Sequence, residues 1–275
     1  MLAENKIESL GSRVMADSKT ISLTSKRQAR LLQRVQAQSY VDTQDLRSYL
    51  GVSEATVRRD LVDLEARGLI RRTHGGALPA GQIIQEYSNA ERLVQNAAEK
   101  ARIGKAAAEL VAEGDVVFID AGTTTLQVAR HLAHRKDLTF VTNGTDIATC
   151  LSAAEVERLF VIGGEYCDIN HSLSGSLAAE MIARFNVDKL FLSVSAVDLN
   201  RAQINVATPT VAATQRAMIA IAQKVIVLAD HSKFTKSALS MITSLGDVDL
   251  IVTDSGSREQ ISDLPETLQQ KFIFA

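Results

Sequence analysis

Apolar and polar positions alternate with helical spacing between residues 53 and 66. Apolar residues recur there at i, i+4 and i+7, as Val57, Leu61 and Leu64. Ser53 is a residue type that caps helix N-termini. The opposite face is polar and basic, with Glu54, Thr56, Arg58, Arg59 and Asp63. Residues 42–50 predict a shorter amphipathic helix, and Gly51 marks the turn between the two helices.

Two short extended segments follow this second helix. Residues 69–72 and 77–78 flank a His74-Gly75-Gly76 turn, which predicts a β-hairpin, and Gly68 ends the helix before it. Two short helices with a Gly-containing turn are typical of a helix-turn-helix, whose second helix enters the major groove of DNA. The alternative is a surface helical hairpin with a solvated basic face. The hairpin, read as a wing along the phosphates, favours DNA binding.

Charge is distributed unevenly along the 275-residue chain. Residues 19–80 hold eleven Lys and Arg against six acidic residues, whereas the whole chain has a formal net charge of −2. A basic N-terminal segment followed by an acidic remainder indicates a DNA-binding domain joined to a separate regulatory domain. Cys150 and Cys167 lack zinc-ligand spacing, and no cofactor or metal is expected. No apolar run approaches the roughly 20 residues of a membrane span, so we expect a soluble cytoplasmic protein without a membrane partner.

From residue 115 onward, short apolar runs alternate with helical segments. The predicted strands are residues 116–120, 138–142, 159–163, 189–194, 225–229 and 250–253. The predicted helices between them are residues 124–133, 145–153, 178–185 and 211–222. Continuous apolar strands separated by helices indicate an α/β fold with a parallel sheet covered on both faces. An Ala-rich helix over residues 97–112 is expected to flank this sheet.

These patterns divide the chain into four segments. Residues 1–22 are polar and unpatterned and are predicted to be disordered. Residues 23–78 form the predicted winged helix-turn-helix domain, which begins with a helix at 25–37. Residues 79–96 contain Pro79 and Gly81 and are interpreted as a linker. Residues 97–275 form the larger, Rossmann-like parallel-sheet domain.

Glycines and short polar residues follow four of the predicted strands. Ligands of open α/β sheets bind at the carboxyl ends of the strands. A Gly before a helix N-terminus admits an anion, Asn can bind sugar hydroxyls, and Lys is a point charge for phosphate. Each motif alone has a structural alternative, such as a Thr-capped helix, an Asn-Gly turn or a surface ion pair. The candidate effector-binding residues are Asp120, Gly122, Thr123, Thr124, Thr142, Asn143, Gly163, Gly164, Asp230 and Lys233.

The helices and wing resemble those of DeoR-type bacterial transcription regulators. The matching elements are Val57-Arg58-Arg59-Asp60-Leu61, Leu64, Gly68 and His74-Gly75-Gly76-Ala77. The remaining chain resembles that family's sugar-phosphate sensor domain, which is related in fold to ribose-5-phosphate isomerase and glucosamine-6-phosphate deaminase. The resemblance implies a homodimeric or homotetrameric repressor of a carbohydrate-catabolism operon. Such a repressor binds double-stranded operator DNA and is released by a phosphorylated sugar or polyol.

The expected DNA contacts come from all parts of the winged domain. They are Ser25, Lys26, Ser53, Thr56, Arg58, Arg59, Arg71, Arg72 and His74. Phosphate contacts position a protein whereas base contacts specify sequence, and the spacing does not divide these residues between the two roles. Two stretches of the sensor domain depart from the family's common pattern. Residues 195–198 replace a Gly-containing acidic loop, and residues 208–212 contain no acid.

Two other functions remain open at this point. A sugar-phosphate isomerase or deaminase needs a positioned acid and base, for which Asp120, Glu165, Asp198 and Asp230 are available. The active-site pattern of those enzymes is not recognisable, and His171 and His231 have no evident orienting partner in the sequence, so an enzyme is not expected. The second alternative is an activator or a purely architectural DNA-binding protein. The predicted effector site disfavours the architectural role, and only the resemblance favours a repressor over an activator.

Overall fold

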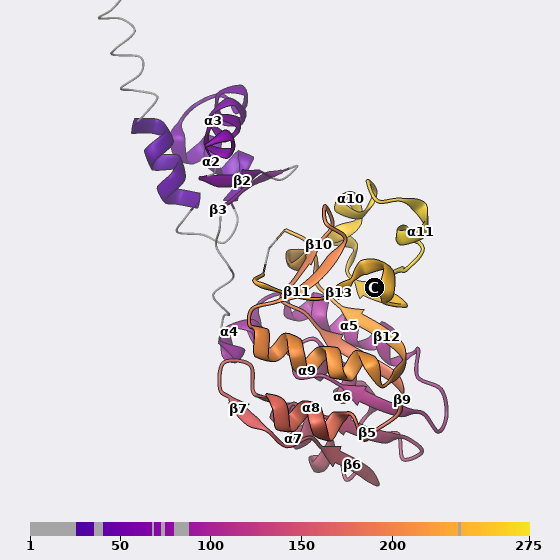
Figure 1. Cartoon of the computed structure of the whole chain (residues 1–275). Coiled ribbons are helices and arrows are strands. Elements are labelled where there is room, and N and C mark those ends of the chain that lie inside the picture. Colours follow the sequence, from indigo (N-terminus) through magenta and orange to yellow (C-terminus); the bar gives the residue numbers. More distant parts are fainter. Residues whose placement is uncertain (1–25, 36–40, 68, 73–74, 80–87, 236–237) are drawn as a thin grey trace, which may run out of the picture. The chain divides into compact units, whose positions relative to one another are not determined.

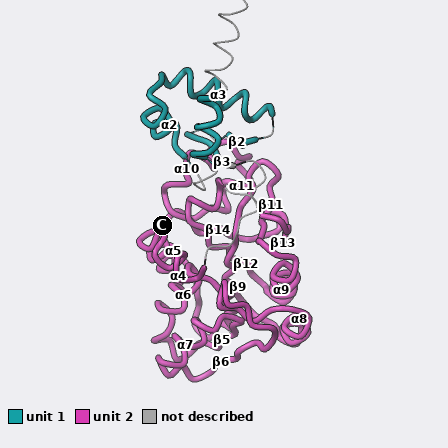
Figure 2. Tube along the Cα trace, turned by 90° about the vertical axis from the view of Figure 1, so that its left-hand side faces the viewer, with its two compact units in different colours: residues 1–82 teal, residues 83–275 magenta. Residues whose placement is uncertain are grey.

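The computed structural model describes residues 26–35, 41–67, 69–72, 75–79, 88–235 and 238–275. The chain divides into two compact units, residues 1–82 and residues 83–275 (Figure 2). Each unit has its own hydrophobic core. The predicted disordered segment, residues 1–22, lies outside the described residues.

The described part of unit 1 contains three helices and a small sheet. A helix over residues 26–35 precedes the other elements. These are β1 (Val41–Asp42), α2 (Thr43–Leu50), α3 (Glu54–Ala66), β2 (Ile70–Arg72) and β3 (Gly76–Pro79) (Figure 1). The predicted helices at 42–50 and 53–66 are therefore confirmed as α2 and α3. Residues from all three helices form the core, including Leu31, Leu46, Val57, Leu61 and Leu64.

Local hydrogen bonds set the ends of the two helices. The Asp42 carboxylate accepts from the Gln44 N–H at the start of α2. The Ser53 hydroxyl accepts from the Thr56 N–H at 3.3 Å at the start of α3. Between them, Gly51 has a φ of 66°, and its N–H bonds to the Arg47 carbonyl. Glycine adopts this left-handed conformation without the steric penalty of other residues, which explains the sharp turn.

The sheet of unit 1 has three antiparallel strands rather than the two of the predicted hairpin. β2 pairs with β3, with Ile70 opposite Pro79, and β1 pairs with the other edge of β3, with Val41 opposite Ala77. The β2–β3 hairpin is the predicted wing. A two-residue strand such as β1 carries no period of its own, so the sequence did not reveal it.

A partly buried ion pair joins the first helix of unit 1 to α3. The Arg27 guanidinium donates to both Asp60 oxygens, at 2.5 and 2.9 Å, and Gln28 donates to the same carboxylate at 3.4 Å. The side chain of Asp60 is only 3% exposed. A bidentate Arg–carboxylate pair fixes geometry as well as charge, so this contact holds α3 in place.

Replacing Asp60 with alanine is expected to destabilise unit 1 strongly. Removing Asp60 deletes the two charge-assisted hydrogen bonds from the partly exposed Arg27 and costs about 2 kcal/mol, which corresponds to roughly a thirtyfold loss of amide hydrogen-exchange protection in α3. The measurement is hydrogen exchange of residues 57–64 in the full chain. Replacing the exposed Asp45 of α2 is the control, with an expected cost of about 0.5 kcal/mol. Equal exchange in both variants would show that the Arg27–Asp60 pair does not stabilise α3.

Unit 2 is built on a parallel sheet of seven strands in the order β15-β14-β12-β9-β4-β5-β6. Every neighbouring pair in it is parallel. The strands are β4 (Val116–Ile119), β5 (Thr139–Thr142), β6 (Arg158–Val161), β9 (Val187–Ser193), β12 (Ala222–Leu228), β14 (Leu250–Thr253) and β15 (Phe272–Phe274). Six of them are the predicted strands. The parallel α/β sheet is thus confirmed, with β15 added at one edge.

Helices cover both faces of this sheet (Figure 1). On one face lie α5 (Ala97–Ala108), α6 (Thr125–Leu132) and α7 (Thr145–Ala153), which pack on one core cluster. On the other face lie α8 (Ser176–Ile182) and α9 (Pro209–Ala220), which pack on a second cluster. Consecutive strand residues alternate between the clusters, because Val117 and Ile119 belong to the first and Phe118 to the second.

Smaller elements lie between these layers. β7 (Glu165–Cys167) and β8 (Ser172–Ser174) form an antiparallel hairpin. β10 (Ala196–Asp198), β11 (Gln203–Val206) and β13 (Ser240–Ser244) form a three-stranded antiparallel sheet. The remaining elements are three 3₁₀ turns and two short helices, namely η1 (His231–Lys233), η2 (Leu245–Asp247), η3 (Ser255–Ser257), α10 (Arg258–Ile261) and α11 (Glu266–Gln269).

Part of the predicted linker is helical. Helix α4 (Asn89–Val94) begins with a capping box, in which Ser88 and Glu91 bond to each other's backbone N–H groups. It is held to the body of unit 2 by Asn89, whose side chain donates to Asp146 of α7 at 2.5 Å. Residues 80–87 lie outside the described part of the chain.

Candidate DNA interface and effector site

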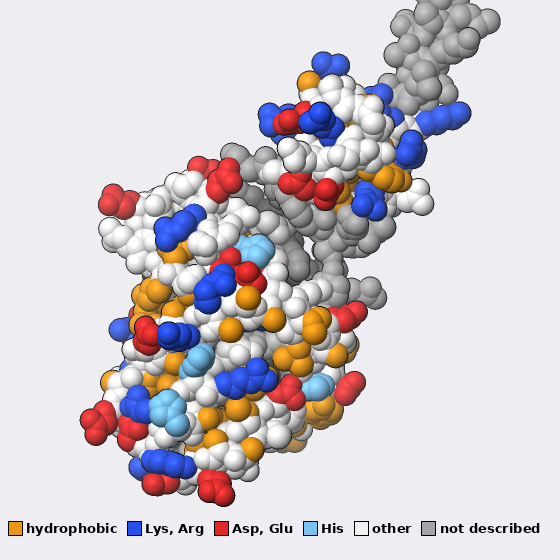
Figure 3. Space-filling view, turned by 180° about the vertical axis from the view of Figure 1, so that it is seen from behind, with side chains coloured by type: hydrophobic (Ala, Val, Ile, Leu, Met, Phe, Trp, Pro, Cys, Tyr) orange, Lys and Arg blue, Asp and Glu red, His pale blue; other side chains and the backbone are white. Residues whose placement is uncertain are grey.

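The outer face of α3 carries exposed basic side chains, and Lys and Arg side chains are prominent on unit 1 (Figure 3). Arg58 and Arg59 are both exposed, and Arg58 pairs with Glu54 one turn earlier at 2.6 Å. The Thr56 hydroxyl lies 2.9 Å from the Ser53 hydroxyl at the N-cap. An exposed i, i+4 pair contributes only a few tenths of a kcal/mol, so Arg58 can exchange Glu54 for a phosphate at little cost.

The structure describes the side chains of only some of the other predicted DNA contacts. Lys26 is exposed at the start of the first helix. The Arg72 guanidinium lies 3.8 Å from the Glu65 carboxylate, and the Arg72 side chain is exposed. Ser25 and His74 lie outside the described residues, and Arg71 is in β2 with its side chain not described.

Two arginines of the first helix that were not among the predicted DNA contacts lie over a tyrosine of α2. The guanidinium carbons of Arg30 and Arg34 lie 5.2 and 5.1 Å from the centroid of the Tyr49 ring of α2. These distances are typical of cation–π contacts. The i, i+4 spacing of the two arginines was visible in the sequence, but their common partner is on another helix.

In unit 2, Asp120 lies directly after β4 and is 2% exposed. Its Oδ2 accepts from the Gln215 side chain of α9 at 2.7 Å and from the Ser193 N–H of β9 at 3.1 Å. Burial raises the pKa of Asp120 to about 7, although hydrogen bonds from Gln215, Ser193, Ala121 and Asn143 oppose the increase. Burial therefore favours the protonated form of this carboxyl group far more than that of an exposed aspartate.

The loop after Asp120 approaches β9 closely. A Cβ on Gly122 would lie 2.3 Å from the Ser193 hydroxyl, so glycine is required there. Thr123 and Thr124 are buried, and Thr124 makes no capping hydrogen bond to α6. The alternative interpretation of this motif as a Thr-capped helix is therefore not what the structure has.

The end of β5 is held by its own polar side chains. Thr142 donates to the Ile119 carbonyl at 2.6 Å and accepts from the Gly144 N–H. Asn143 accepts from the Ala121 N–H at 3.0 Å and donates to the Leu173 carbonyl of β8. Thr142 thus joins two strand ends, whereas Asn143 joins the β4 loop to the β7–β8 hairpin.

Of the two predicted glycines after β6, only Gly164 lies in close contact with a neighbouring strand. A Cβ on Gly164, whose φ is 148°, would lie 2.6 Å from the Ser174 carbonyl. A Cβ on Gly163 would meet no atom within 4 Å. Gly164 therefore permits close contact with β8.

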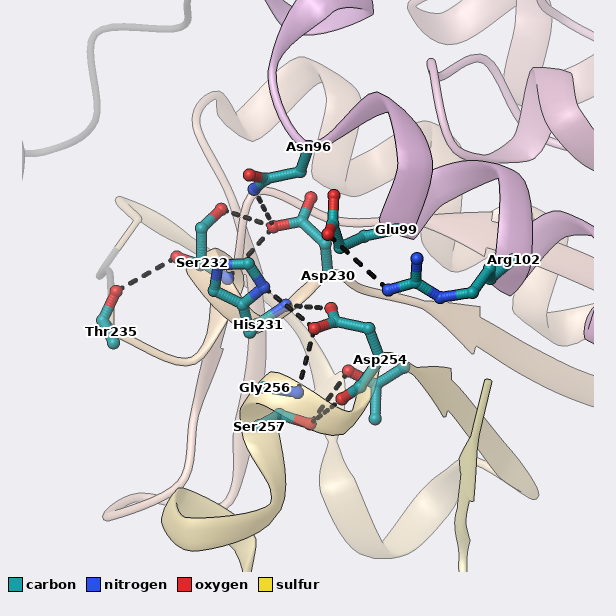
Figure 4. Close-up of polar contacts among 11 residues, drawn as sticks. Asn96, Glu99, Arg102, Asp230, His231, Ser232, Thr235, Asp254, Gly256 and Ser257 are labelled. Atoms are coloured by element: carbon teal, nitrogen blue, oxygen red, sulfur yellow. Dashed lines mark hydrogen bonds and ion pairs between the residues drawn. The ribbon is translucent and has the colours of Figure 1, made fainter.

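Asp230 is the centre of a polar cluster after β12, drawn in Figure 4. One of its oxygens accepts from Asn96 at 2.9 Å and from the Ser232 N–H and hydroxyl at 3.0 and 2.5 Å. Burial alone would raise the pKa of Asp230, but the charges of Lys233 and Lys100 and these hydrogen bonds lower it. Asp230 is therefore ionised, and it joins the turn carrying Lys233 to the residue between α4 and α5.

Both histidines near the strand ends have orienting partners, which corrects the interpretation from the sequence. His231 Nδ1 lies 2.9 Å from the buried Asp254 carboxylate (Figure 4). His171 Nδ1 lies 2.9 Å from Asp146. Asp254 is 23 positions from its histidine and Asp146 is 25, and neither interval has a recognisable spacing, so the fold alone brings these pairs together.

A pocket opens at the carboxyl edge of β4, β5 and β9. The space between its walls, counted out to the open solvent, is about 400 Å³. Hydroxyl and amide side chains dominate the lining, and the charged lining residues are Arg92 of α4 and Asp120. The lining residues are Arg92, Asp120, Ala121, Asn143, Asn170, Ser172, Ser174, Ser193, Val194, Ser195, Val206, Val211, Thr214 and Gln215.

The pocket therefore includes two of the predicted effector residues, Asp120 and Asn143, and several that sequence reasoning missed. Gly122, Thr123, Thr124 and Thr142 are not among the residues that line it. Asp230 and Lys233 belong to the neighbouring cluster at the end of β12, and β9 separates β12 from β4 in the sheet. Arg92, Ser193 and Gln215 come from elements far apart in sequence, and no local motif marks them.

Comparison with known proteins agrees with both units. Residues 27–81 match the DeoR-like helix-turn-helix domain, and residues 95–255 match the DeoR C terminal sensor domain. The chain belongs to the DeoR family. The transcriptional repressor AccR of Agrobacterium fabrum is 46% identical over 252 residues, which cover 92% of this chain and 98% of that protein. The glycerol-3-phosphate regulon repressor of Escherichia coli is 33% identical, with 82% of this chain and 88% of that protein covered.

Solved structures resemble the DeoR chain less closely. Ribose 5-phosphate isomerase A of Methanocaldococcus jannaschii is 17% identical and covers 51% of this chain and 55% of its own, with a TM-score of 0.39. A superposition at this level carries no argument about function. Among the described helices of this DeoR protein, none is long and apolar enough to cross a membrane.

Asp120 of the DeoR sensor domain is expected to give a measurable pH dependence. Its pKa is 3.8 in an ordinary environment and about 7 in the fold, so the folded state binds a proton that the unfolded state releases between those values. The contribution of Asp120 to stability is therefore complete below pH 4 and is lost as the pH rises through 7. The melting temperature of wild type should fall relative to that of Asp120→Asn between pH 5 and pH 8.

The control is Asp263→Asn, because Asp263 is exposed. The difference in melting temperature between Asp263→Asn and wild type should be constant over the same pH range. Parallel curves for wild type and Asp120→Asn would mean that the Asp120 pKa lies outside the range.

Proposed function

We propose that this protein is a repressor of a carbohydrate-catabolism operon, released from operator DNA by a phosphorylated sugar or polyol. The observation that carries the proposal is the polar pocket at the carboxyl edge of the sheet, in a sensor domain attached to a winged helix-turn-helix. The relatives support the direction of regulation, because both AccR and the glycerol-3-phosphate regulon protein are repressors. The second of these is also named for a phosphorylated polyol.

At the DNA end, α3 is the proposed recognition helix in the major groove. Its buried face, with Val57 and Leu64, holds it on unit 1, while Arg58 and Arg59 extend outward. The wing between β2 and β3 lies along the adjacent phosphates. A homodimer or homotetramer supplies two such units for the half-sites of an operator. The proposed contacts are Ser25, Lys26, Ser53, Thr56, Arg58, Arg59, Arg71, Arg72 and His74.

At the effector end, the sugar or polyol part is proposed to bind in the pocket beside Asp120 and Asn143. Gly122 and the buried Thr123 and Thr124 directly precede α6, at whose N-terminus an anion is favoured. Lys233 supplies a positive charge at the neighbouring strand end. Thr142, Gly163, Gly164 and Asp230 are proposed to shape the site through the contacts described above.

Helix α4 is the proposed route from the pocket to the DNA-binding unit. It is the first described element of unit 2, and its Arg92 lines the pocket. The residue two positions after α4, Asn96, donates to Asp230. Lys100 further binds the Arg92 and Gln95 carbonyls. A ligand that displaces Arg92, or whose phosphate pairs with Lys233, would therefore shift the equilibrium between different positions of α4. That shift would in turn change the arrangement of the DNA-binding units.

The proposal is tested by a thermal-shift screen of phosphorylated sugars and polyols beside their unphosphorylated parents. A ligand that binds only the folded state raises the melting temperature by mass action. Phosphorylated compounds alone should stabilise the protein and should release it from DNA in a gel-shift assay. Stabilisation by free sugars alone, or by none of these compounds, would contradict the proposed effector class.

Turnover of a sugar phosphate is the second candidate function, and the Asp120 pKa of about 7 is the observation that favours it. A general base works best when its pKa lies near the working pH. The test is product formation from ribose 5-phosphate and from glucosamine 6-phosphate by purified protein. We expect none, because the relatives are repressors; sustained multiple turnovers would overturn this expectation.

A further inference from the structure

The side-chain amide of Gln215 has one possible orientation. Its Nε2 lies 2.7 Å from Asp120 Oδ2 and 2.8 Å from the Ser193 carbonyl oxygen. A protonated Asp120 could donate, but a backbone carbonyl can only accept. The NH₂ group, and not Oε1, must therefore face Ser193. Both Nε2 hydrogens are used by these two acceptors.

The other end of this amide lacks a partner. Gln215 is 3% exposed, and its Oε1 has no hydrogen-bond partner among the described residues. Leaving a buried acceptor unsatisfied is costly. Because Gln215 lines the pocket and Nε2 is committed to the wall made by β4 and β9, Oε1 is the amide atom left for an occupant of the pocket.

We propose that Gln215 determines effector specificity by accepting a hydrogen bond from a hydroxyl group of the ligand through its Oε1. The inference rests on the proposed function and deepens it. A phosphorylated polyol or sugar with a free hydroxyl at this point satisfies the carbonyl oxygen. An analogue with a hydrogen at this position leaves Oε1 without a partner, and an analogue with a carbonyl oxygen there places a second acceptor opposite Oε1. Either analogue should therefore bind more weakly.

The alternative occupant is a single ordered water, for which the pocket has room. A water bound to Oε1 would satisfy the acceptor without any role in ligand choice. The two possibilities differ in what happens when only the acceptor is removed, and a substitution that keeps the donor function of residue 215 separates them.

The test compares Gln215→Lys with wild type by calorimetric binding of three pairs of compounds. The pairs are ribose 5-phosphate with 2-deoxyribose 5-phosphate, glucose 6-phosphate with 2-deoxyglucose 6-phosphate, and glycerol 3-phosphate with 1,3-propanediol monophosphate. A lysine at 215 can still donate to Asp120 and to the Ser193 carbonyl but accepts nothing. We expect the tightest wild-type ligand to bind this variant about tenfold or more weakly.

Two further variants keep the result interpretable. Gln223→Lys is the matched control, because the exposed Gln223 also donates to an aspartate, Asp188, at 3.1 Å, but lies outside the pocket. It should bind every compound as wild type does. Gln215→Met removes the acceptor without adding charge and should weaken binding to a similar extent, even if its melting temperature falls.

The outcomes separate the two proposals. Wild-type affinity in both Gln215→Lys and Gln215→Met would overturn the role of Gln215 and assign Oε1 to a water. Absence of binding by wild type to all six compounds would instead contradict the proposed effector class. Weakened binding in both variants, with Gln223→Lys unchanged, would support the inference.

Discussion

Replacing Arg58 and Arg59 together with alanine is expected to weaken operator binding by at least about tenfold and to flatten its salt dependence. Each lost phosphate contact lowers the slope of log affinity against log salt by about one. The slope should therefore fall by about two for every copy of unit 1 on the DNA. The measurement is fluorescence anisotropy with a duplex selected by the wild-type protein, over a range of salt concentrations.

The fold should tolerate this double substitution. Both side chains are exposed on α3, and the Arg58–Glu54 pair is a solvent-facing i, i+4 contact. Alanine has the highest intrinsic helix propensity, so the helix itself loses little. The loss is therefore specific to DNA rather than to stability, and the melting temperature is the check.

The matched control removes two positive charges from unit 2. Arg130 and Arg184 are exposed there, and their double alanine variant has the same net charge as the α3 variant. It should keep the wild-type affinity and slope. An equal loss in both variants would mean that overall charge governs binding; no loss in either would remove α3 from the interface.

The same arginines show what the sequence can predict well. The period of Val57, Leu61 and Leu64 fixes which face of α3 is buried, so the outward direction of Arg58 and Arg59 follows without a structure. Continuous apolar runs likewise predicted six strands of the parallel sheet, because a buried strand has few other compositions available. The spacing of apolar residues predicts a helix or strand well when the same neighbouring surface covers it along its whole length.

Elements whose partners are remote escaped this reasoning. β1, with two residues, exists only because β3 offers it an edge, and β15 only because β14 does. In the candidate site, the strand ends at Asp120 and Asn143 were predictable from the rule for parallel sheets. Gln215 and Arg92 were not, since each reaches the pocket from a helix of another part of the chain. Their roles depend on packing between distant segments, which local patterns do not encode.

Replacing Lys233 with alanine is expected to abolish the response to a phosphorylated effector and to leave DNA binding within about twofold of wild type. Lys233 follows β12 and lowers the pKa of Asp230 by its charge. Without it the turn keeps its hydrogen bonds from Ser232 and Asn96, so the fold survives. What is lost is the cation proposed for the phosphate, and the thermal shift caused by phosphorylated compounds should disappear.

Two comparisons make this result decisive. Lys224→Ala, at an exposed position of the same strand, should respond to the effector as wild type does. Each variant's thermal shift is measured against its own ligand-free melting temperature, because the loss of a charge beside ionised Asp230 lowers the stability of the free protein. If Lys233→Ala still shows the full thermal shift, at the same effector concentration as wild type, Lys233 does not bind the phosphate. Its role would then be limited to the electrostatic interaction with Asp230.

In that event Arg92 becomes the cation that holds the phosphate, since it is the basic residue among those lining the pocket. Arg92→Ala would then lose the phosphorylated ligand while Lys233→Ala kept it. The distinction matters for regulation as well as for affinity. A phosphate bound by Arg92 acts on α4 directly, whereas one bound by Lys233 acts on it through Asp230 and Asn96. Asn96→Ala should uncouple ligand binding from DNA release only in the second case.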